Sequence, residues 1–196
     1  MSLTPSGIRL RLSDAGRDRG DHDLNPGMAP ADRMRAAAVL VPLVARPEGT
    51  TVLLTRRTEH LHHHAGQISF PGGRIEEVDP SPEEAALRET EEEIGLSRSH
   101  IEVVGRLGRY RTRTGFEITP IVGWVTPPFE LAPDRFEVAE VFEVPLSFVA
   151  DPANHERRSR EWQGVVRHFY VLPYGGYYIW GATAGMLVNL AERLKP

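Results

Sequence analysis

The segment SPEEAALRETEEEIG, residues 81–95, constrains the fold most strongly because it predicts a helix with both ends defined. Ser81 and Glu84 have the spacing of a capping box, and Pro82 takes the first helical position, where its missing N–H costs nothing. Gly95 is placed to end the helix in a left-handed conformation. The rest of the chain must therefore provide a surface for this helix.

The faces of this helix differ in chemistry. At 100° per residue, Glu89, Glu92 and Glu93 share one flank, whereas Glu91 points away from them. The neighbouring stripe is mostly apolar and should face a core; it consists of Ala86, Leu87, Thr90 and Ile94. The sequence thus predicts three converging carboxylates at the edge of a core.

Converging carboxylates are costly unless something neutralises them. Two like charges about 4 Å apart repel by ~1 kcal/mol in water and by ~4 kcal/mol at an effective dielectric of 20. A hard divalent cation would remove this cost, and Mg²⁺ prefers oxygen ligands that it shares with a substrate phosphate. The alternative is a solvated acidic face, which most glutamate-rich helices have.

Charge is unevenly distributed along the chain. Between Arg74 and Glu93 there are nine acidic residues and only two arginines, so this segment has a net charge of −7. Because the whole chain has a formal net charge of −4, the remaining residues together carry +3. An acidic patch attracts cations, and a basic surround can hold an anion beside them. Arg88 lies four residues from both Glu84 and Glu92 and can brace either.

Length and pattern predict one α/β domain with a mixed sheet and flanking helices. Residues 1–33 lack a clear period and are expected to form an N-terminal arm, partly mobile or a short helix, before a single domain at 34–196. Pro42 indicates a strand end or edge. Strands are expected at 36–45, 50–57, 67–70, 100–108 and 116–125, a hairpin at 164–173 and 176–181, a helix at 181–194, and either structure at 138–149.

Several classes of function are disfavoured. The chain has no cysteine, which excludes disulfides and cysteine-based sites and fits a cytoplasmic protein. No apolar run suits a signal peptide or the ~20 residues of a membrane span. The formal net charge of −4 gives no indication of general nucleic-acid binding. We expect neither membrane nor nucleic-acid partners, and a homodimer is left open.

The acidic helix is part of a longer motif. GGRIEEVDPSPEEAALRETEEEIGL, residues 72–96, resembles the Nudix box, the signature of hydrolases that act on a nucleoside diphosphate linked to another group. The matching residues are Arg88, Glu89, Glu92, Glu93, Gly95 and Leu96. Asp79 replaces the first glutamate and lies one residue too far from Arg88, and Thr90 replaces an apolar residue. The role of Asp79 is therefore open, whereas the helical half is intact.

The preceding segment narrows the resemblance. LLTRRTEHLHHHAGQISFPGG, residues 53–73, is similar to the run before the box in the coenzyme A pyrophosphatase branch, although His62 stands where arginine is common. The agreeing residues are His64, Gly66, Gln67, Phe70, Pro71, Gly72 and Gly73. The resemblance spans about residues 36–194 and implies a Nudix-type α/β/α sandwich with a mixed central sheet and flanking helices.

This resemblance implies a metal-dependent hydrolase that cuts the diphosphate of coenzyme A, or of its thioesters, into 4′-phosphopantetheine and adenosine 3′,5′-bisphosphate. Mg²⁺ or Mn²⁺ would be held by Glu89 and Glu93, with Glu92 as a further ligand or as the base. Arg88 completes the expected catalytic set. The substrate side is expected to include Arg56, Arg57, His64, Gly72, Gly73 and Arg109.

Other interpretations remain open. The substrate could instead be NADH, a nucleotide sugar or a dinucleoside polyphosphate, or the domain could bind a nucleotide as a non-catalytic sensor. HLHHH at 60–64 is a weaker candidate for a transition-metal site. Arg109, Arg111 and Arg113 either meet substrate phosphates or form a solvated loop.

Overall fold

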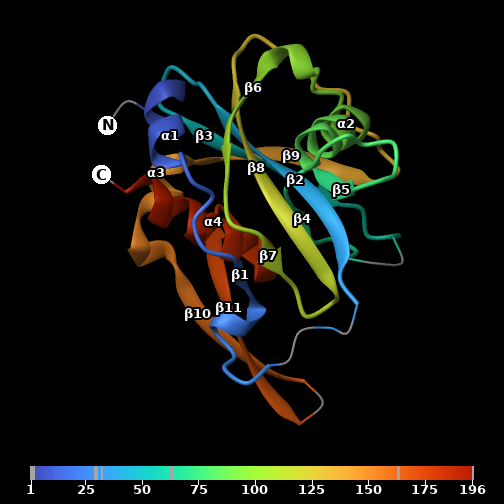
Figure 1. Cartoon of the computed structure of the whole chain (residues 1–196), viewed down its shortest axis with the longest axis vertical. Helices are drawn as coiled ribbons and strands as arrows, with labels where there is room; N and C mark the ends of the chain where they lie inside the picture. Colours follow the sequence, from blue (N-terminus) through green and yellow to red (C-terminus); the bar gives the residue numbers. More distant parts are fainter. Residues whose placement is uncertain (1–2, 29–30, 32, 62–63, 163, 196) are drawn as a thin grey trace.

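A mixed sheet with helices on both faces forms the body of the protein (Figure 1), as the α/β/α prediction requires. The computed structural model describes residues 3–28, 31, 33–61, 64–162 and 164–195. The helices are α1 Pro5–Arg11, α2 Pro82–Ile94, α3 Leu146–Ala150 and α4 Gly181–Leu194. The main sheet contains β1 Arg19–Gly20, β2 Arg35–Val44, β3 Thr51–Arg57, β4 Ile68–Ser69, β5 Gly72–Arg74, β6 Ile101–Arg106, β7 Tyr110–Arg111, β8 Phe116–Val125 and β9 Val138–Pro145.

Strand β2 is the centre of this sheet. It runs parallel to β8 along its full length and is antiparallel to β3 and β5. Val41 and Leu43 belong to the core beneath α4, whereas Leu40 packs in the cluster beneath α2. This alternation is the period of two expected for a strand buried on both faces.

The prediction from Pro42 was wrong, because Pro42 lies inside β2 rather than at its end or at a sheet edge. On the side away from β8, the pairing of β2 with β5 ends at Val39, and its pairing with β3 begins at Leu43. Pro42 falls between these two ladders, where a missing N–H interrupts neither of them.

Helix α2 begins and ends where the sequence predicts, but only the Ser81 half of the predicted capping box forms, because the Glu84 side chain pairs with Arg98 at 2.9 Å. The Ser81 hydroxyl accepts a hydrogen bond from the Glu84 N–H at 3.2 Å, and Gly95 ends the helix with φ +69°. Ala85, Ala86 and Ile94 are fully buried against the sheet. Burial of this apolar stripe fixes the rotation of the helix and hence the direction of its glutamates.

The described part of the N-terminal segment packs against the domain. The short helix α1 buries Ile8 and the following Leu12 in the main core, and β1 pairs with β7. Beyond β1, the Asn25 side chain accepts a hydrogen bond from the His168 N–H and donates to the His168 carbonyl, both at 2.9 Å. Residues 3–28 are therefore held along most of their length rather than forming a free arm.

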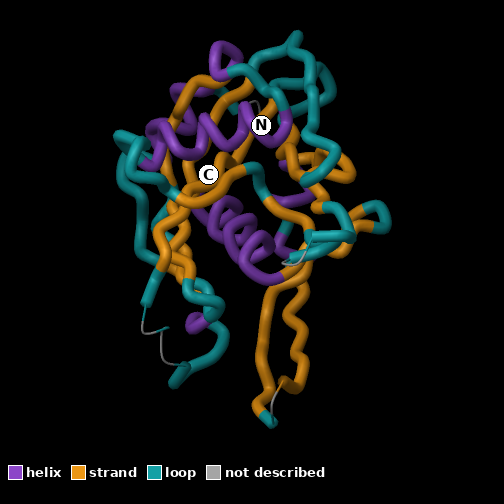
Figure 2. The backbone as a smooth tube through the Cα atoms, turned by 90° about the vertical axis from the view of Figure 1, so that its right-hand side faces the viewer, coloured by secondary structure: helices purple, strands orange, loops and turns teal. Residues whose placement is uncertain are grey.

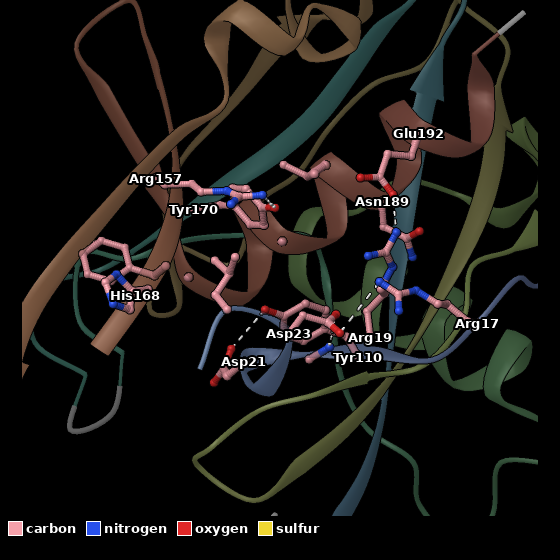
Figure 3. Close-up of a pocket in the computed structure, with 16 residues that line it drawn as sticks. Arg17, Arg19, Asp21, Asp23, Tyr110, Arg157, His168, Tyr170, Asn189 and Glu192 are labelled. Carbon is pink, nitrogen blue, oxygen red and sulfur yellow. Dashed lines mark hydrogen bonds and ion pairs between the residues drawn. The ribbon is translucent and has the colours of Figure 1, made fainter. Parts of the chain in front are cut away.

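A small cavity of about 210 Å³ separates this segment from α4 (Figure 3). Most of its charged groups have partners: Arg19 pairs with Glu192 of α4, the Tyr110 hydroxyl donates to Asp21 at 3.0 Å, and Arg157 donates to the Tyr170 hydroxyl at 3.3 Å. Because most of these groups bind one another across the cavity, we assign it a structural role.

Strands β10 Glu156–Trp162, β11 Val165–Tyr174 and β12 Tyr177–Trp180 form a second, antiparallel sheet. The β10–β11 hairpin extends beyond the body of the domain (Figure 2). The sequence predicted β11 and β12 but not β10, because ERRSREW is polar and lacks an apolar period. The ambiguous segment 138–149 is strand β9 followed by helix α3. No helix in the described part of the chain is long and apolar enough to cross a membrane.

Candidate active site

Two glycines bring the backbone of β5 against α2 and β2. Gly72 has φ +146°, and a Cβ at this position would lie 2.4 Å from the Ala38 carbonyl oxygen. A Cβ on Gly73 would lie 2.5 Å from the carboxylate of Glu89. A residue larger than glycine would therefore displace the backbone of the central strand at Gly72, or the Glu89 carboxylate at Gly73.

Glu93 is the most buried carboxylate of the helix, with 8 % of its surface exposed. It accepts a hydrogen bond from the Gly72 N–H at 3.0 Å, and Arg57 Nη1 lies 3.5 Å from its other oxygen. Burial raises the pKa of Glu93 to about 7, against the opposing effects of Gly72 and Arg57. The folded protein therefore holds this carboxylate in an environment that disfavours its charge.

Glu89 lies one turn earlier on the same flank and is also largely buried. Burial raises its pKa, and the hydrogen bond from Arg88 Nη1 at 3.0 Å opposes that shift. The charge of Glu89 contributes to the raised pKa of Glu93, and the charge of Glu92 contributes to the raised pKa of Glu89. Two partly desolvated carboxylates thus converge beside the glycines of β5.

Arg88 is fixed by a bidentate ion pair with Asp79. Arg88 Nε and Nη2 each donate to one Asp79 oxygen at 2.9 Å, and this contact lowers the pKa of Asp79 to about 2. Arg88 Nη1 then reaches Glu89 and Glu92, both at 3.0 Å. Asp79, whose role the sequence left open, therefore positions the arginine between the glutamates.

The remaining glutamates follow the predicted helical phase. Glu92 is exposed, with 61 % of its side chain accessible, and its contact is to Arg88. Glu91 points away and pairs with Arg98 at 3.5 Å. The three predicted ligands are therefore unequal: Glu89 and Glu93 lie together, and Glu92 stands at the solvent edge.

The donor set suits a hard divalent cation that is only partly enclosed by protein. The described residues contain no group of three or more histidine, aspartate or glutamate side chains arranged to hold a metal by themselves. Glu89 and Glu93 offer carboxylate oxygens, and burial raises their pKa values despite the nearby Arg88 and Arg57. Mg²⁺ is usually held by one or two carboxylates with waters and substrate phosphates, which fits such a pair.

A cavity of about 620 Å³ opens beside Gly72 and Gly73, within the range of roughly 300–1,000 Å³ usual for ligand sites. Its walls come from β2, β8, the 64–73 loop, α4 and the β10–β11 hairpin. Its charged lining is mostly basic: Arg57, Arg74, Arg113, Arg160 and Arg167, with Asp21 as the acid. The cavity therefore favours an anionic ligand.

The structure brings only some of the predicted substrate residues to this cavity. Arg57 and His64 line it together with both glycines. Arg56 points to the opposite face of β3 because neighbouring strand residues alternate, and it pairs with Glu140 at 3.0 Å. Arg109 pairs with Asp18 at 3.1 Å and Glu117 at 2.8 Å, outside the cavity lining.

Of the three consecutive histidines at 62–64, the structure describes only His64. His64 has φ +59°, and its Nδ1 lies 2.9 Å from Gln67 Oε1, which makes it a turn residue at the cavity wall. His62 and His63 lie outside the described residues, and with them most of the HLHHH metal-site hypothesis. The sequence analysis did not predict Arg160 and Arg167 as site residues. The feature that could have indicated them is their placement on either side of the β10–β11 turn, but β10 has no apolar period that would predict a strand.

The structure combines an acidic helix packed on a mixed sheet with a basic cavity beside Gly72 and Gly73. The NUDIX domain model matches residues 34–163, and the chain belongs to this family. Nudix hydrolases act on phosphoanhydride bonds of nucleotide derivatives and generally use divalent metal ions.

Two relatives agree with this membership, and a solved structure shares the fold. The chain is 41 % identical over 159 residues to a Yersinia enterocolitica protein named "Uncharacterized Nudix hydrolase NudL", with 81 % of each chain covered. A Yersinia pestis protein of the same name is 39 % identical over 161 residues, covering 82 % of this chain and 80 % of that one. A MutT/nudix family protein from Enterococcus faecalis shares the fold with a TM-score of 0.51 at 18 % identity, over 85 % of this chain and 64 % of that one.

Proposed function

We propose that this Nudix hydrolase cleaves the diphosphate of coenzyme A, free or as a thioester, into 4′-phosphopantetheine and adenosine 3′,5′-bisphosphate. The observation that carries the proposal is the position of the 64–73 loop. This loop bears the motif that resembles the coenzyme A pyrophosphatase branch, and His64, Gln67 and Phe70 from it line the large basic cavity.

The cavity has the chemistry that such a substrate needs. Coenzyme A carries a diphosphate and a further phosphate on its ribose, so it presents a dense negative charge. Five arginines and a single acid occur among the described residues of the lining, which favours such an anion over a neutral ligand. Apolar side chains such as Val39, Ile118 and Met186 complete the lining and suit a base or an uncharged arm.

Different residues of the chain would bind the metal and take up the proton at the diphosphate. Mg²⁺ or Mn²⁺, when bound, would offset the diphosphate charge and lower the pKa of the attacking water. Glu89 and Glu93 are the residues that would hold it. Arg88 orients Glu89, whereas the Gly72 N–H and Arg57 orient Glu93. Glu92, exposed at the edge of the cluster, is suited to take up the proton of the attacking water.

A substrate panel in saturating Mg²⁺ tests the proposal. Coenzyme A, an acyl-coenzyme A, NADH, a nucleotide sugar and a dinucleoside polyphosphate would be compared by kcat/KM, with products identified by mass. We expect the two coenzyme A compounds to be preferred and adenosine 3′,5′-bisphosphate to be released. A clear preference for another compound would assign the protein to a different Nudix substrate, and binding of a nucleotide without any turnover would make it a sensor.

A further inference from the structure

The β10–β11 hairpin presents one face to the large cavity. In an antiparallel pair of strands, two directly opposed residues have their side chains on the same face. The residues two positions further along either strand share that face. Arg160 opposes Arg167, and Trp162 opposes Val165, so these four side chains lie on the same face. Arg160, Trp162 and Arg167 all line the cavity that also contains Gly72 and Gly73.

The two arginines of this face repel each other without compensation. Like charges placed directly opposite each other across strands destabilise a sheet. Neither Arg160 nor Arg167 makes an ion pair within the described residues, and the buried Nε of Arg167 has no hydrogen-bond partner there. By contrast, Arg158 on the same face pairs with Glu156 at 2.6 Å.

The rest of the cavity does not supply the missing negative charge. Asp21 is the one acid among the described lining residues. It already accepts hydrogen bonds from the Tyr110 hydroxyl at 3.0 Å and from the Arg113 N–H at 2.8 Å. A pair of uncompensated guanidinium groups therefore faces a cavity that is large enough for a nucleotide.

Aromatic side chains flank the arginine pair. Trp162 and Trp180 are large apolar residues that remain 49 % and 39 % exposed, and both line the cavity. Phe169, two residues beyond Arg167, packs edge-on against Trp180 with ring centroids 5.5 Å apart. An indole face beside guanidinium groups is suited to a heterocyclic base that carries a phosphate nearby.

We propose that Arg160 and Arg167 bind a second phosphate of the substrate, on the ribose away from the diphosphate, and that Trp162 and Trp180 contact its base. This inference rests on the proposed function, since it assigns the substrate end that distinguishes coenzyme A from its dephospho form. Arg160 and Trp162 lie within the family match, whereas Arg167, Phe169 and Trp180 lie beyond residue 163, where it ends. In this proposal the hairpin selects the substrate, and the hydrolytic chemistry takes place at α2.

The first test compares kcat/KM for coenzyme A and dephospho-coenzyme A. Arg160→Gln and Arg167→Gln should each lower the value for coenzyme A by roughly 10- to 100-fold, the size of a charge-assisted contact, and change that for dephospho-coenzyme A by less than about threefold. Arg158→Gln is the matched control, because it lies on the same strand and face but already pairs with Glu156. A preference that survives in both variants would overturn the proposal.

A second test does not depend on turnover. Two of the chain's three tryptophans line the site, so binding of adenosine 3′,5′-bisphosphate and of AMP can be followed by intrinsic fluorescence, with Trp162→Phe to assign the signal. The bisphosphate should bind roughly 10- to 100-fold more tightly than AMP, and Arg167→Gln should remove this difference.

These two tests separate the failure of the site from the failure of the proposed function. If neither coenzyme A compound is hydrolysed, the proposed function fails, and a bisphosphate preference that disappears in Arg167→Gln still supports the arginine site. Equal hydrolysis of the two compounds, with equal binding of bisphosphate and AMP, overturns the site and leaves the pyrophosphohydrolase in place. A change in oligomeric state on Arg167→Gln, measured by light scattering without any change in nucleotide binding, would instead make this face an interface between copies.

Discussion

Replacement of Glu93 by glutamine should stabilise the protein in the absence of metal. Glutamine keeps the shape and can still accept the hydrogen bond from the Gly72 N–H, but it removes the charge that burial disfavours. The pKa of Glu93 is raised from 4.5 to about 7. Because the folded pKa is the higher one, the stability contributed by protonated Glu93 is complete below the unfolded pKa and is lost as the pH rises through 7.

The size of this effect follows from the two pKa values. Ionised Glu93 should cost the folded protein about 1 kcal/mol at pH 5 and about 3 kcal/mol at pH 8. For a chain of this length the latter corresponds to a Tm increase of up to roughly 6–12 °C for Glu93→Gln at pH 8, and a much smaller one at pH 5. Glu91→Gln is the control, since Glu91 is exposed and pairs with Arg98.

Thermal unfolding of the wild type and both variants in EDTA, at pH 5 and pH 8, measures this directly. Added Mg²⁺ should raise the Tm of the wild type more than that of Glu93→Gln. Destabilisation by Glu93→Gln at pH 8, or a Tm shift that is the same at both pH values, would refute the inference that burial strains this carboxylate.

Three further predictions address activity and packing. Glu89→Gln should lower kcat by about 100-fold or more in saturating Mg²⁺, whereas Glu91→Gln should change it less than about twofold, as steady-state kinetics will measure; equal losses would mean that the helical phase is misassigned. Gly73→Ala should reduce kcat by at least about tenfold with an unchanged circular dichroism spectrum, because its Cβ would lie 2.5 Å from the Glu89 carboxylate; full activity would exclude that close approach. Ile8→Ala should lower the free energy of unfolding by roughly 2–5 kcal/mol in urea titrations, and a change near zero would show that α1 does not contribute to the core.

The sequence predicted most of the sheet and the acidic helix for identifiable reasons. Helix α2 has its cap, its terminating glycine and its apolar stripe within one local segment, so its ends and its phase follow from 15 residues. Strand β2 is an apolar run after its first residue and β8 is mostly apolar, which indicates burial on both faces.

What the sequence did not predict depends on contacts between distant segments. Arg56 and Arg57 are adjacent in the chain, and only the pairing of β3 with β9 decides which of them meets Glu93. The bidentate contact between Asp79 and Arg88 requires the turn before α2 to fold back on the helix. The arginine face of the β10–β11 hairpin likewise arises from a strand register that a polar segment does not specify.

In the proposed function, Glu89 and Glu93, beside Gly72 and Gly73, support metal-dependent cleavage of the coenzyme A diphosphate. The most direct measurement is the initial rate of adenosine 3′,5′-bisphosphate release from coenzyme A as Mg²⁺ is titrated, for the wild type, Glu93→Gln and the Glu91→Gln control. We expect a saturable Mg²⁺ dependence in the wild type and Glu91→Gln, and a rate lower by about 100-fold or more in Glu93→Gln at every Mg²⁺ concentration. Release that is independent of Mg²⁺, or Glu93→Gln turning over at the wild-type rate, would contradict it.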